Sequence, residues 1–190
     1  MARHVLAVEL DPHWVERLCG RWNNVKVVEG DAALVRLPQE PFRVVANLPF
    51  DRTTDLLHVL LDDPRIPLER ADLIVEWAVA RKRAVPWPST LNGVVWGAFY
   101  ESTVARRLPA GAFEPPPRVE AGVLVFRRRT EPLVPTQLAS SYRRFVARGF
   151  RRGLRAVASA RGIRSVGGRS VFGRDLDAHQ WAELFRRIDM

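Results

Sequence analysis

The sequence predicts an α/β protein with a largely parallel, doubly wound sheet, followed by a small helical part. Two observations predict this fold. Short apolar segments alternate with stretches of helical pattern over the first 77 residues, which is typical of a parallel sheet with crossover helices. Two longer strand-like segments and then helices alone follow. The 190 residues suffice for one domain with a small second one.

The first strand is predicted at residues 5–10 and ends next to an acidic side chain. Asp11 and Pro12 then begin a helix over residues 13–22, because Asp is a good N-cap and Pro is favoured at the first helical position. The next predicted elements, in chain order, are strands at 25–28 and 42–46, a helix at 54–61 and a strand at 73–77.

Two further segments, residues 100–108 and 123–126, are predicted to pair as antiparallel strands that close the sheet. The loop between them contains Phe113–Val119 and is stiffened by three prolines. Helices are predicted after the arginine triplet at 127–129, and they cover 137–148, 151–161 and 178–187, with a loop at 162–173. The last helix begins with a capping box formed by Asp177 and Gln180. We therefore expect an α/β domain at 1–129 and a basic helical domain at 130–190.

The positive charge is concentrated in the last third of the chain. The net charge is +9, but residues 1–126 carry 15 basic and 16 acidic side chains, whereas residues 127–190 carry 15 and 5. Arginine makes up 28 of the 30 basic residues, which a GC-rich genome explains equally well. The asymmetry is a separate feature, and it indicates a polyanionic partner, with nucleic acid the first choice.

Several classes of protein are disfavoured by composition. No apolar run approaches the roughly 18 residues of a membrane span, so we expect no membrane partner. The single cysteine, Cys19, excludes an intramolecular disulfide and fits a reducing cytoplasm, where we place the protein. The four histidines have no metal-ligand spacing, so no metal site is expected.

Polar side chains follow the first three predicted strands where each strand ends. Ligands of open α/β sheets bind at the carboxyl ends of the strands. Glu9 can accept both hydroxyls of a ribose, and Asp31 can accept a hydrogen bond from the amino group of a bound adenine. The backbone N–H of Ala32 can meet a ring nitrogen of that adenine. The third side chain, Asn47, begins a separate motif.

The motif Asn47-Leu48-Pro49-Phe50 suits methylation of an adenine amino group. That nitrogen is a poor nucleophile because its lone pair is delocalised into the ring. The Asn47 side-chain oxygen and the Leu48 carbonyl can accept its two hydrogens and stabilise the positive charge that develops on it. Pro49 fixes the backbone, and Phe50 can stack on an extruded base.

With these motifs the sequence resembles the Erm-type 23S ribosomal RNA adenine-N6 methyltransferases, which belong to the family of KsgA and Erm ribosomal RNA adenine dimethylases. The resemblance covers essentially the whole chain. The matching segments are Val8–Asp11, Glu29–Ala32, Asn47–Phe50, Glu76–Lys82, Phe113–Val119, Leu176–Trp181 and Leu184–Phe185.

The resemblance implies a Rossmann-like methyltransferase fold and S-adenosylmethionine as the methyl donor. It implies an adenine of large-subunit ribosomal RNA as acceptor and resistance to macrolide-type antibiotics. The implied catalytic residues are Asn47, Leu48, Pro49 and Phe50. The implied cofactor-binding residues are Glu9, Leu10, Asp31, Ala32 and Asn47.

The chain departs from the family pattern at its start. Family members have an earlier strand and a Gly-rich loop that cradles the methionine part of the cofactor, and no glycine precedes Gly20 here. We expect the chain to be a fragment or a misassigned start of a longer gene; the alternative is a natural short protein in which another segment fills the gap. Glu76 and Ala78 also differ from the Gln and Glu expected of Erm proteins.

The arginines of the basic part are expected to bind the phosphates of RNA. This candidate surface consists of Arg127, Arg128, Arg129, Arg143, Arg144, Arg148, Arg151, Arg152 and Arg155. The leading hypothesis is a monomeric ribosomal RNA methyltransferase. One alternative is a truncated, catalytically inactive RNA-binding protein. Another is a DNA adenine methyltransferase, which is disfavoured because those enzymes tend to carry an acid at the position of Asn47.

Overall fold

The computed structural model of the chain describes residues 3–84, 90–159, 162–164 and 172–187. The strands are β1 (Val5–Glu9), β2 (Val25–Glu29), β3 (Phe42–Asn47), β4 (Leu68–Glu76), β5 (Tyr100–Leu108) and β6 (Ala121–Arg128). The α-helices are α1 (Pro12–Leu18), α2 (Thr53–Leu61), α3 (Trp77–Arg83), α4 (Leu91–Gly97), α5 (Ala139–Arg152) and α7 (Ala178–Arg186). Short 3-10 helices are η1 (Ala110–Ala112), η2 (Thr136–Leu138), η3 (Leu154–Ala156) and η4 (Gly173–Asp175).

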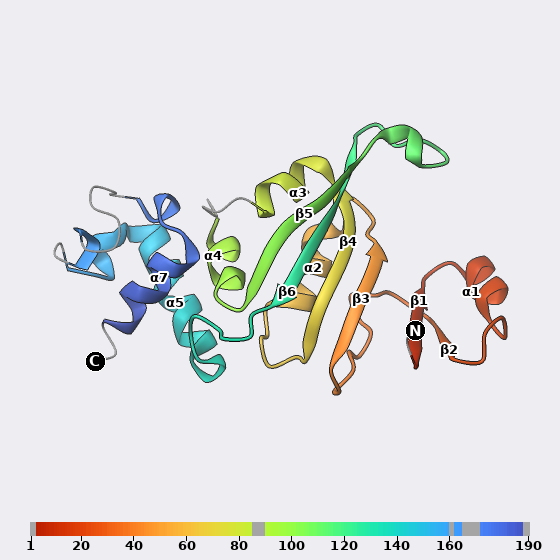
Figure 1. Ribbon diagram of the computed structural model, residues 1–190, viewed down its shortest axis with the longest axis horizontal. Helices are drawn as coiled ribbons and strands as arrows, with labels where there is room; N and C mark the ends of the chain where they lie inside the picture. The colour runs from red at the N-terminus through yellow and green to blue at the C-terminus, as the bar shows by residue number, and fades with distance from the viewer. Residues whose placement is uncertain (1–2, 85–89, 160–161, 165–171, 188–190) are drawn as a thin grey trace.

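The strands form two separate sheets (Figure 1). β1 and β2 make a parallel pair, and the larger sheet has the order β3-β4-β6-β5. Within the larger sheet β3 and β4 are parallel, whereas β6 is antiparallel to both β4 and β5. The predicted antiparallel end of the sheet is confirmed. Among the described residues, one edge of β1 and one edge of β3 pair with no strand. The two sheets therefore share no hydrogen-bonded pair of strands.

One continuous core joins the larger sheet to the C-terminal helices. The strand β6 lies between two partners and is buried along most of its length. Helix α2 contributes an apolar face of four leucines: Leu56, Leu57, Leu60 and Leu61. The same cluster extends through α4 to Tyr142 of α5 and Trp181 of α7. Helix α4, which lies between β4 and β5 in the chain, thus anchors the basic C-terminal part.

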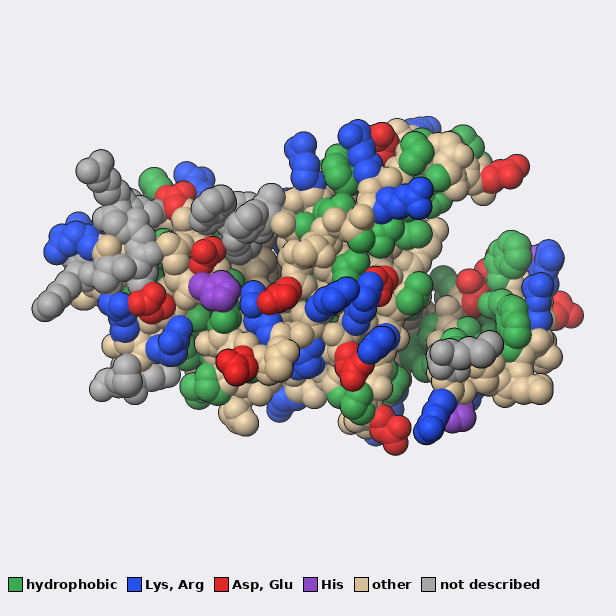
Figure 2. Space-filling model, viewed as in Figure 1, with side chains coloured by type: hydrophobic (Ala, Val, Ile, Leu, Met, Phe, Trp, Pro, Cys, Tyr) green, Lys and Arg blue, Asp and Glu red, His purple; other side chains and the backbone are tan. Residues whose placement is uncertain are grey.

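The lobe formed by β1, α1 and β2 packs differently. Helix α1 has no buried residue, although Asp11 caps it through a 2.9 Å bond from the His13 N–H and Pro12 begins it as predicted. Leu10 is 66% exposed and Trp14 49% exposed. Figure 2 shows hydrophobic side chains at the surface of this lobe. Because it buries little apolar area, we expect this lobe to have a low local stability.

The C-terminal helices match the prediction only in part. The capping box at the start of α7 is confirmed by reciprocal bonds between Asp177 and Gln180. The predicted helix at 151–161 is wrong, because α5 itself continues to Arg152 and Gly153 then adopts a φ of 81°, which ends it. Residues 160–161 of that prediction, and residues 165–171 of the predicted loop, lie outside the described part.

Candidate functional site

The junction between β3 and α2 presents the motif that the sequence singled out. Asn47 is the last residue of β3, and it is exposed. The backbone N–H of Leu48 donates to the carbonyl of Ile74 at 3.0 Å, which extends the pairing with β4 and directs the Leu48 side chain into the core. Among the described residues, nothing hydrogen-bonds to the Asn47 carboxamide or to the Leu48 carbonyl. Both oxygens predicted to meet the acceptor amine are therefore available.

The first turn of α2 holds this motif in place. The Pro49 carbonyl accepts a bond of 3.1 Å from the Arg52 N–H and one of 3.0 Å from the Thr53 hydroxyl. Thr53 is 1% exposed, and among the described residues it is the one polar residue that is buried. Since a buried hydroxyl without a partner is costly, this bond favours one backbone path through Pro49 and Phe50. Phe50 is half-buried beside it.

Glu9 ends β1, as predicted, and shapes the turn that follows. Its Oε1 accepts bonds from the backbone N–H groups of Leu10 and Asp11 at 2.8 and 3.0 Å. Its other oxygen bonds to none of the described residues and is free for a ribose. Leu10, the neighbouring candidate, is exposed and lies beside this carboxylate through its backbone N–H.

Asp31 follows β2 and lies in a tight turn. Its Oδ1 accepts the Ala33 N–H at 2.8 Å, and its Oδ2 accepts the Arg52 guanidinium at 3.1 Å. The Ala33 N–H, followed by the Arg52 guanidinium, holds the pKa of the Asp31 carboxyl below its ordinary value, so the group is ionised at neutral pH. Ala32 is exposed, and its backbone N–H donates to none of the described residues. This N–H is therefore available for the predicted hydrogen bond to a ring nitrogen.

The structure brings the site residues together in two groups. Glu9 and Asp31 share the β1–β2 lobe, where the Gly30 N–H donates to the Glu9 carbonyl at 2.9 Å. Asn47 belongs to the larger sheet. Among the described residues no hydrogen bond or ion pair joins Glu9 to Asn47, and the Asp31–Arg52 ion pair is the side-chain hydrogen bond that links the two groups.

Sequence reasoning missed Arg52 and Thr53. The signal for Thr53 was present, because Thr53, Leu56, Leu57 and Leu60 follow the spacing of one buried helical face. A polar residue on such a face needs a partner, and the adjacent Pro49 carbonyl was the nearest acceptor. No local sequence pattern predicted the partner of Arg52, because Asp31 lies 21 residues earlier in the chain.

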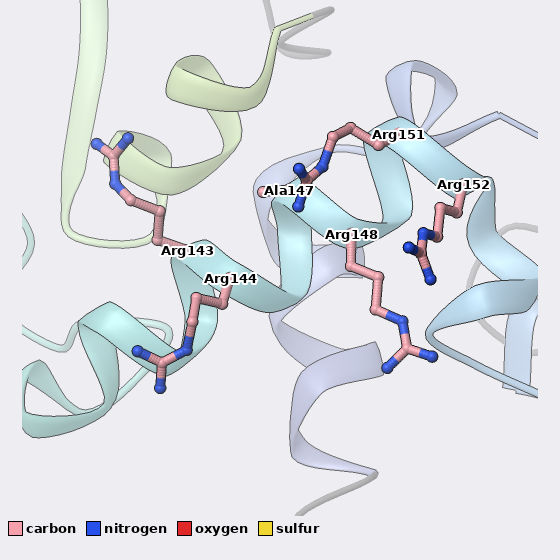
Figure 3. A pocket seen from close by; sticks show the side chains of 6 residues that line it. All are labelled: Arg143, Arg144, Ala147, Arg148, Arg151 and Arg152. Atoms are coloured by element: carbon pink, nitrogen blue, oxygen red, sulfur yellow. The ribbon is translucent and has the colours of Figure 1, made fainter.

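The second candidate surface lies on α5 and on the short 3-10 helix η3 that follows it. Five of the predicted arginines are exposed on these two elements: Arg144, Arg148, Arg151, Arg152 and Arg155. A groove of about 500 Å³ is lined by Ala147 and by arginines of α5 (Figure 3). Arg148 and Arg152, one turn apart, extend to the same side of the helix (Figure 3). Neither forms an ion pair with a described residue, so their charges are available to an anion.

Three predicted RNA contacts have structural partners instead. Arg128 donates to the carbonyls of Pro64, Ile66 and Leu68 and to the Tyr100 hydroxyl, which closes the turn before β4. Arg129 donates to the Gly97 carbonyl at 2.9 Å and to Glu101 at 3.0 Å.

Arg143 bonds to Asp62 and points away from Arg148 and Arg152 in Figure 3. Asp62 also accepts the Trp96 indole N–H at 2.8 Å, so it joins α2 to both α4 and α5. We therefore leave these three arginines out of the proposed RNA surface. Arg127, in contrast, is exposed at the end of β6.

Metal sites and membrane spans are the other features that bear on function. Among the described residues, no group of three or more His, Cys, Asp or Glu side chains lies close enough to hold a metal ion. None of the described helices combines the length and the apolar character needed to cross a membrane.

Comparison with known proteins gives the family. The sequence model of the ribosomal RNA adenine dimethylases matches residues 1–164. The chain belongs to this family. Among its relatives, the mycinamicin-resistance protein MyrB of Micromonospora griseorubida is 35% identical, over 96% of this chain. An rRNA adenine N-6-methyltransferase of Corynebacterium diphtheriae is 32% identical, over 87%.

Solved structures agree with the family assignment. The crystal structure of the 23S rRNA methyltransferase ErmE superposes with a TM-score of 0.80 at 25% identity, covering 100% of this chain and 83% of that one. The predicted Rossmann-like methyltransferase fold is thereby confirmed. The chain spans 62% of MyrB and 63% of the Corynebacterium relative, less than two thirds of each.

Proposed function

We propose that this chain transfers a methyl group from S-adenosylmethionine to the N6 amino group of an adenine in 23S ribosomal RNA. The resulting modification confers resistance to macrolide-type antibiotics. The observation that carries the proposal is the free pair of acceptors, the Asn47 carboxamide and the Leu48 carbonyl, at the end of β3 in a member of the ribosomal RNA adenine dimethylase family.

The adenosine half of the cofactor fits the residues of the β1–β2 lobe. The free oxygen of Glu9 suits the ribose hydroxyls, and the Leu10 backbone lies beside it. Asp31 keeps unused lone pairs for the adenine amino group, because each of its oxygens accepts one of the bonds described. The unpaired Ala32 N–H suits a ring nitrogen. S-adenosylmethionine, when bound, supplies the electrophilic methyl group.

The acceptor adenine is oriented by the loop after β3. Asn47 and Leu48 accept the two amino hydrogens, which turns the nitrogen lone pair out of conjugation and toward the methyl donor. As positive charge develops on that nitrogen, the two oxygens stabilise it. Pro49, held by Thr53, keeps the Leu48 carbonyl in place, and Phe50 stacks on the base. One amino proton is released to solvent after transfer.

The basic surface supplies the binding to RNA. It comprises Arg127, Arg144, Arg148, Arg151, Arg152 and Arg155. We propose that residues 1–129 form the catalytic part and 130–190 the RNA-binding part of a cytoplasmic monomer. The helix α5 suits RNA because its exposed arginines have no carboxylate partners in the described part, so phosphates meet no internal competitor.

The test is methyl transfer with labelled S-adenosylmethionine and a naked 23S RNA transcript, followed by identification of the methylated nucleoside. We expect label in N6-methyladenine and none in a DNA oligonucleotide of the same sequence. Label in another base, or in the DNA alone, would contradict the proposal.

A second function is favoured by one observation. The strands that carry Glu9 and Asn47 belong to separate sheets, and one edge of each remains unpaired among the described residues. If this separation of Glu9 from Asn47 keeps the cofactor away from the base, the protein binds RNA without catalysis. Calorimetry separates the two functions, since this alternative predicts RNA binding with no heat of S-adenosylmethionine binding.

Replacing both Arg148 and Arg152 by Gln is expected to weaken RNA binding at low salt and to reduce its salt dependence. Each phosphate contact contributes about 0.7–0.9 to the slope of log affinity against log salt concentration, so two lost contacts lower the slope by about 1.5. Filter binding from about 50 to 200 mM salt measures it. The matched control is the double variant Arg17→Gln and Arg21→Gln, which removes two exposed arginines of the other lobe. An equal loss in the control would show that only net charge matters.

A further inference from the structure

The ion pair between Asp31 and Arg52 joins the two halves of the proposed site. Asp31 lies after β2 in the β1–β2 lobe, which we call the cofactor lobe, and Arg52 lies two residues after Phe50, at the start of α2. Their atoms are 3.1 Å apart, and both side chains are partly shielded from solvent. No other side-chain hydrogen bond between described residues spans the two lobes, whose sheets share no strand pairing.

The geometry of this contact leaves the Asp31 carboxylate usable. A carboxylate has about four lone-pair positions, of which the Ala33 N–H and the Arg52 guanidinium take two. Arg52 therefore fixes the direction of the carboxylate without blocking it. The guanidinium also faces Asp55 at 3.6 Å, and Asp51 adds a further negative charge nearby. The negative charges of these two acids attract the Arg52 guanidinium and favour its position next to Asp31.

The backbone of Arg52 belongs to the acceptor loop. Its N–H donates to the Pro49 carbonyl at 3.1 Å, which is the same oxygen that Thr53 binds. One residue thus contacts the acceptor loop through its backbone and the cofactor carboxylate through its side chain. Arg52 is therefore the one residue that connects Asp31 to the acceptor loop through these two hydrogen bonds.

We propose that Arg52 is a positioning residue that aligns the cofactor-binding carboxylate of Asp31 with the acceptor loop Asn47–Phe50. The inference rests on the proposed function, and it adds a residue that touches neither methyl donor nor base. Arg52 acts through Asp31, so its removal matters only while Asp31 is present.

The test is a double-mutant cycle of Asp31→Asn and Arg52→Gln, read as the Kd of S-adenosylmethionine by calorimetry. Arg52→Gln alone is expected to raise this Kd about tenfold, since a charge-assisted hydrogen bond that orients the carboxylate is lost. In the Asp31→Asn background the same change is expected to have less than about a twofold effect. Arg52→Lys, which keeps the charge without the planar fork, should recover part of the affinity.

The matched control is Arg43→Gln, which breaks the Arg43–Glu69 pair of the same 3.1 Å length on β3. It should leave the Kd unchanged, because neither residue contacts the cofactor lobe. A tenfold effect of Arg52→Gln in both backgrounds, or in neither, would overturn the inference while leaving the proposed function intact. Absence of cofactor binding by the parent chain would instead contradict the proposed function.

A second measurement needs no cofactor. In the unliganded chain, the carboxyl of Asp31 titrates below its ordinary pKa of 3.8, first because of the Ala33 N–H and then because of Arg52. In Arg52→Gln, nuclear magnetic resonance should show this pKa rising toward 3.8 and faster amide exchange in both residues 31–34 and 47–52. The ion pair exists above the depressed pKa and is lost as the pH falls through it. Unchanged titration and exchange would overturn the inference, whatever the cofactor affinity.

Discussion

Asn47→Ala is expected to reduce methyl transfer to 23S RNA by about 100- to 1,000-fold, as the loss of one preorganised group at a developing charge does. The residue is exposed at the end of β3, and its carboxamide bonds to no other described residue. Its removal therefore takes away a contact to the acceptor amine and little of the fold. Single-turnover methylation with saturating cofactor and RNA measures the effect on the chemical step.

The control for this prediction is Asn23→Ala, in the exposed turn before β2. It removes the same carboxamide far from the reacting atoms, and activity should stay within about twofold of the parent. The unfolding free energy of Asn47→Ala should also change little, within about 0.5 kcal/mol. An Asn47→Ala variant as active as the parent would refute the assigned mechanism, and strong destabilisation would give the residue a structural role instead.

Trp181→Ala is expected to have the largest effect on stability, about 3–5 kcal/mol. Trp181 is fully buried, and its indole N–H donates to the Gly173 carbonyl at 2.9 Å. The ring stacks on Phe150 at 5.6 Å between centroids and packs edge-on against Phe145. A Cβ at Gly149 would lie 2.3 Å from this ring, which shows how closely α5 and α7 approach.

Urea unfolding followed by circular dichroism measures this loss, and RNA affinity near the unfolding midpoint should fall with it, because α5 is the helix that carries the arginines. Trp14→Ala is the control, since Trp14 is 49% exposed on α1 and its loss should cost at most about 0.5 kcal/mol. Similar losses for the two tryptophans would mean that the packing of α7 on α5 does not stabilise the C-terminal part.

Local sequence patterns predicted the strand ends and most of the elements. The order of Glu9, Asp31 and Asn47 after three strands follows from short-range signals, namely apolar runs that end in a polar residue. The cap at Asp11 and the capping box at Asp177 are likewise local, since each involves residues two or three positions apart. The predicted helix at 151–161 failed because Gly153, within that segment, adopts a positive φ and ends α5.

The division of the arginines could not be predicted from sequence. Arg128 and Arg148 look alike in a basic segment, yet Arg128 bonds to carbonyls some 60 residues earlier in the chain, whereas Arg148 is exposed on α5. Arg143 and Arg52 also have distant partners, because Asp62 lies 81 residues before Arg143 and Asp31 lies 21 residues before Arg52.

Periodicity and capping depend on residues that are close together in the sequence. The sequence alone therefore determined which strands end in polar side chains and where the positive charge is concentrated. Ion pairs depend on which surfaces the folded backbone brings within a few ångströms. Only the tertiary structure could therefore separate the arginines that stabilise the fold from those left free for RNA, and show that Arg52 connects the two halves of the site.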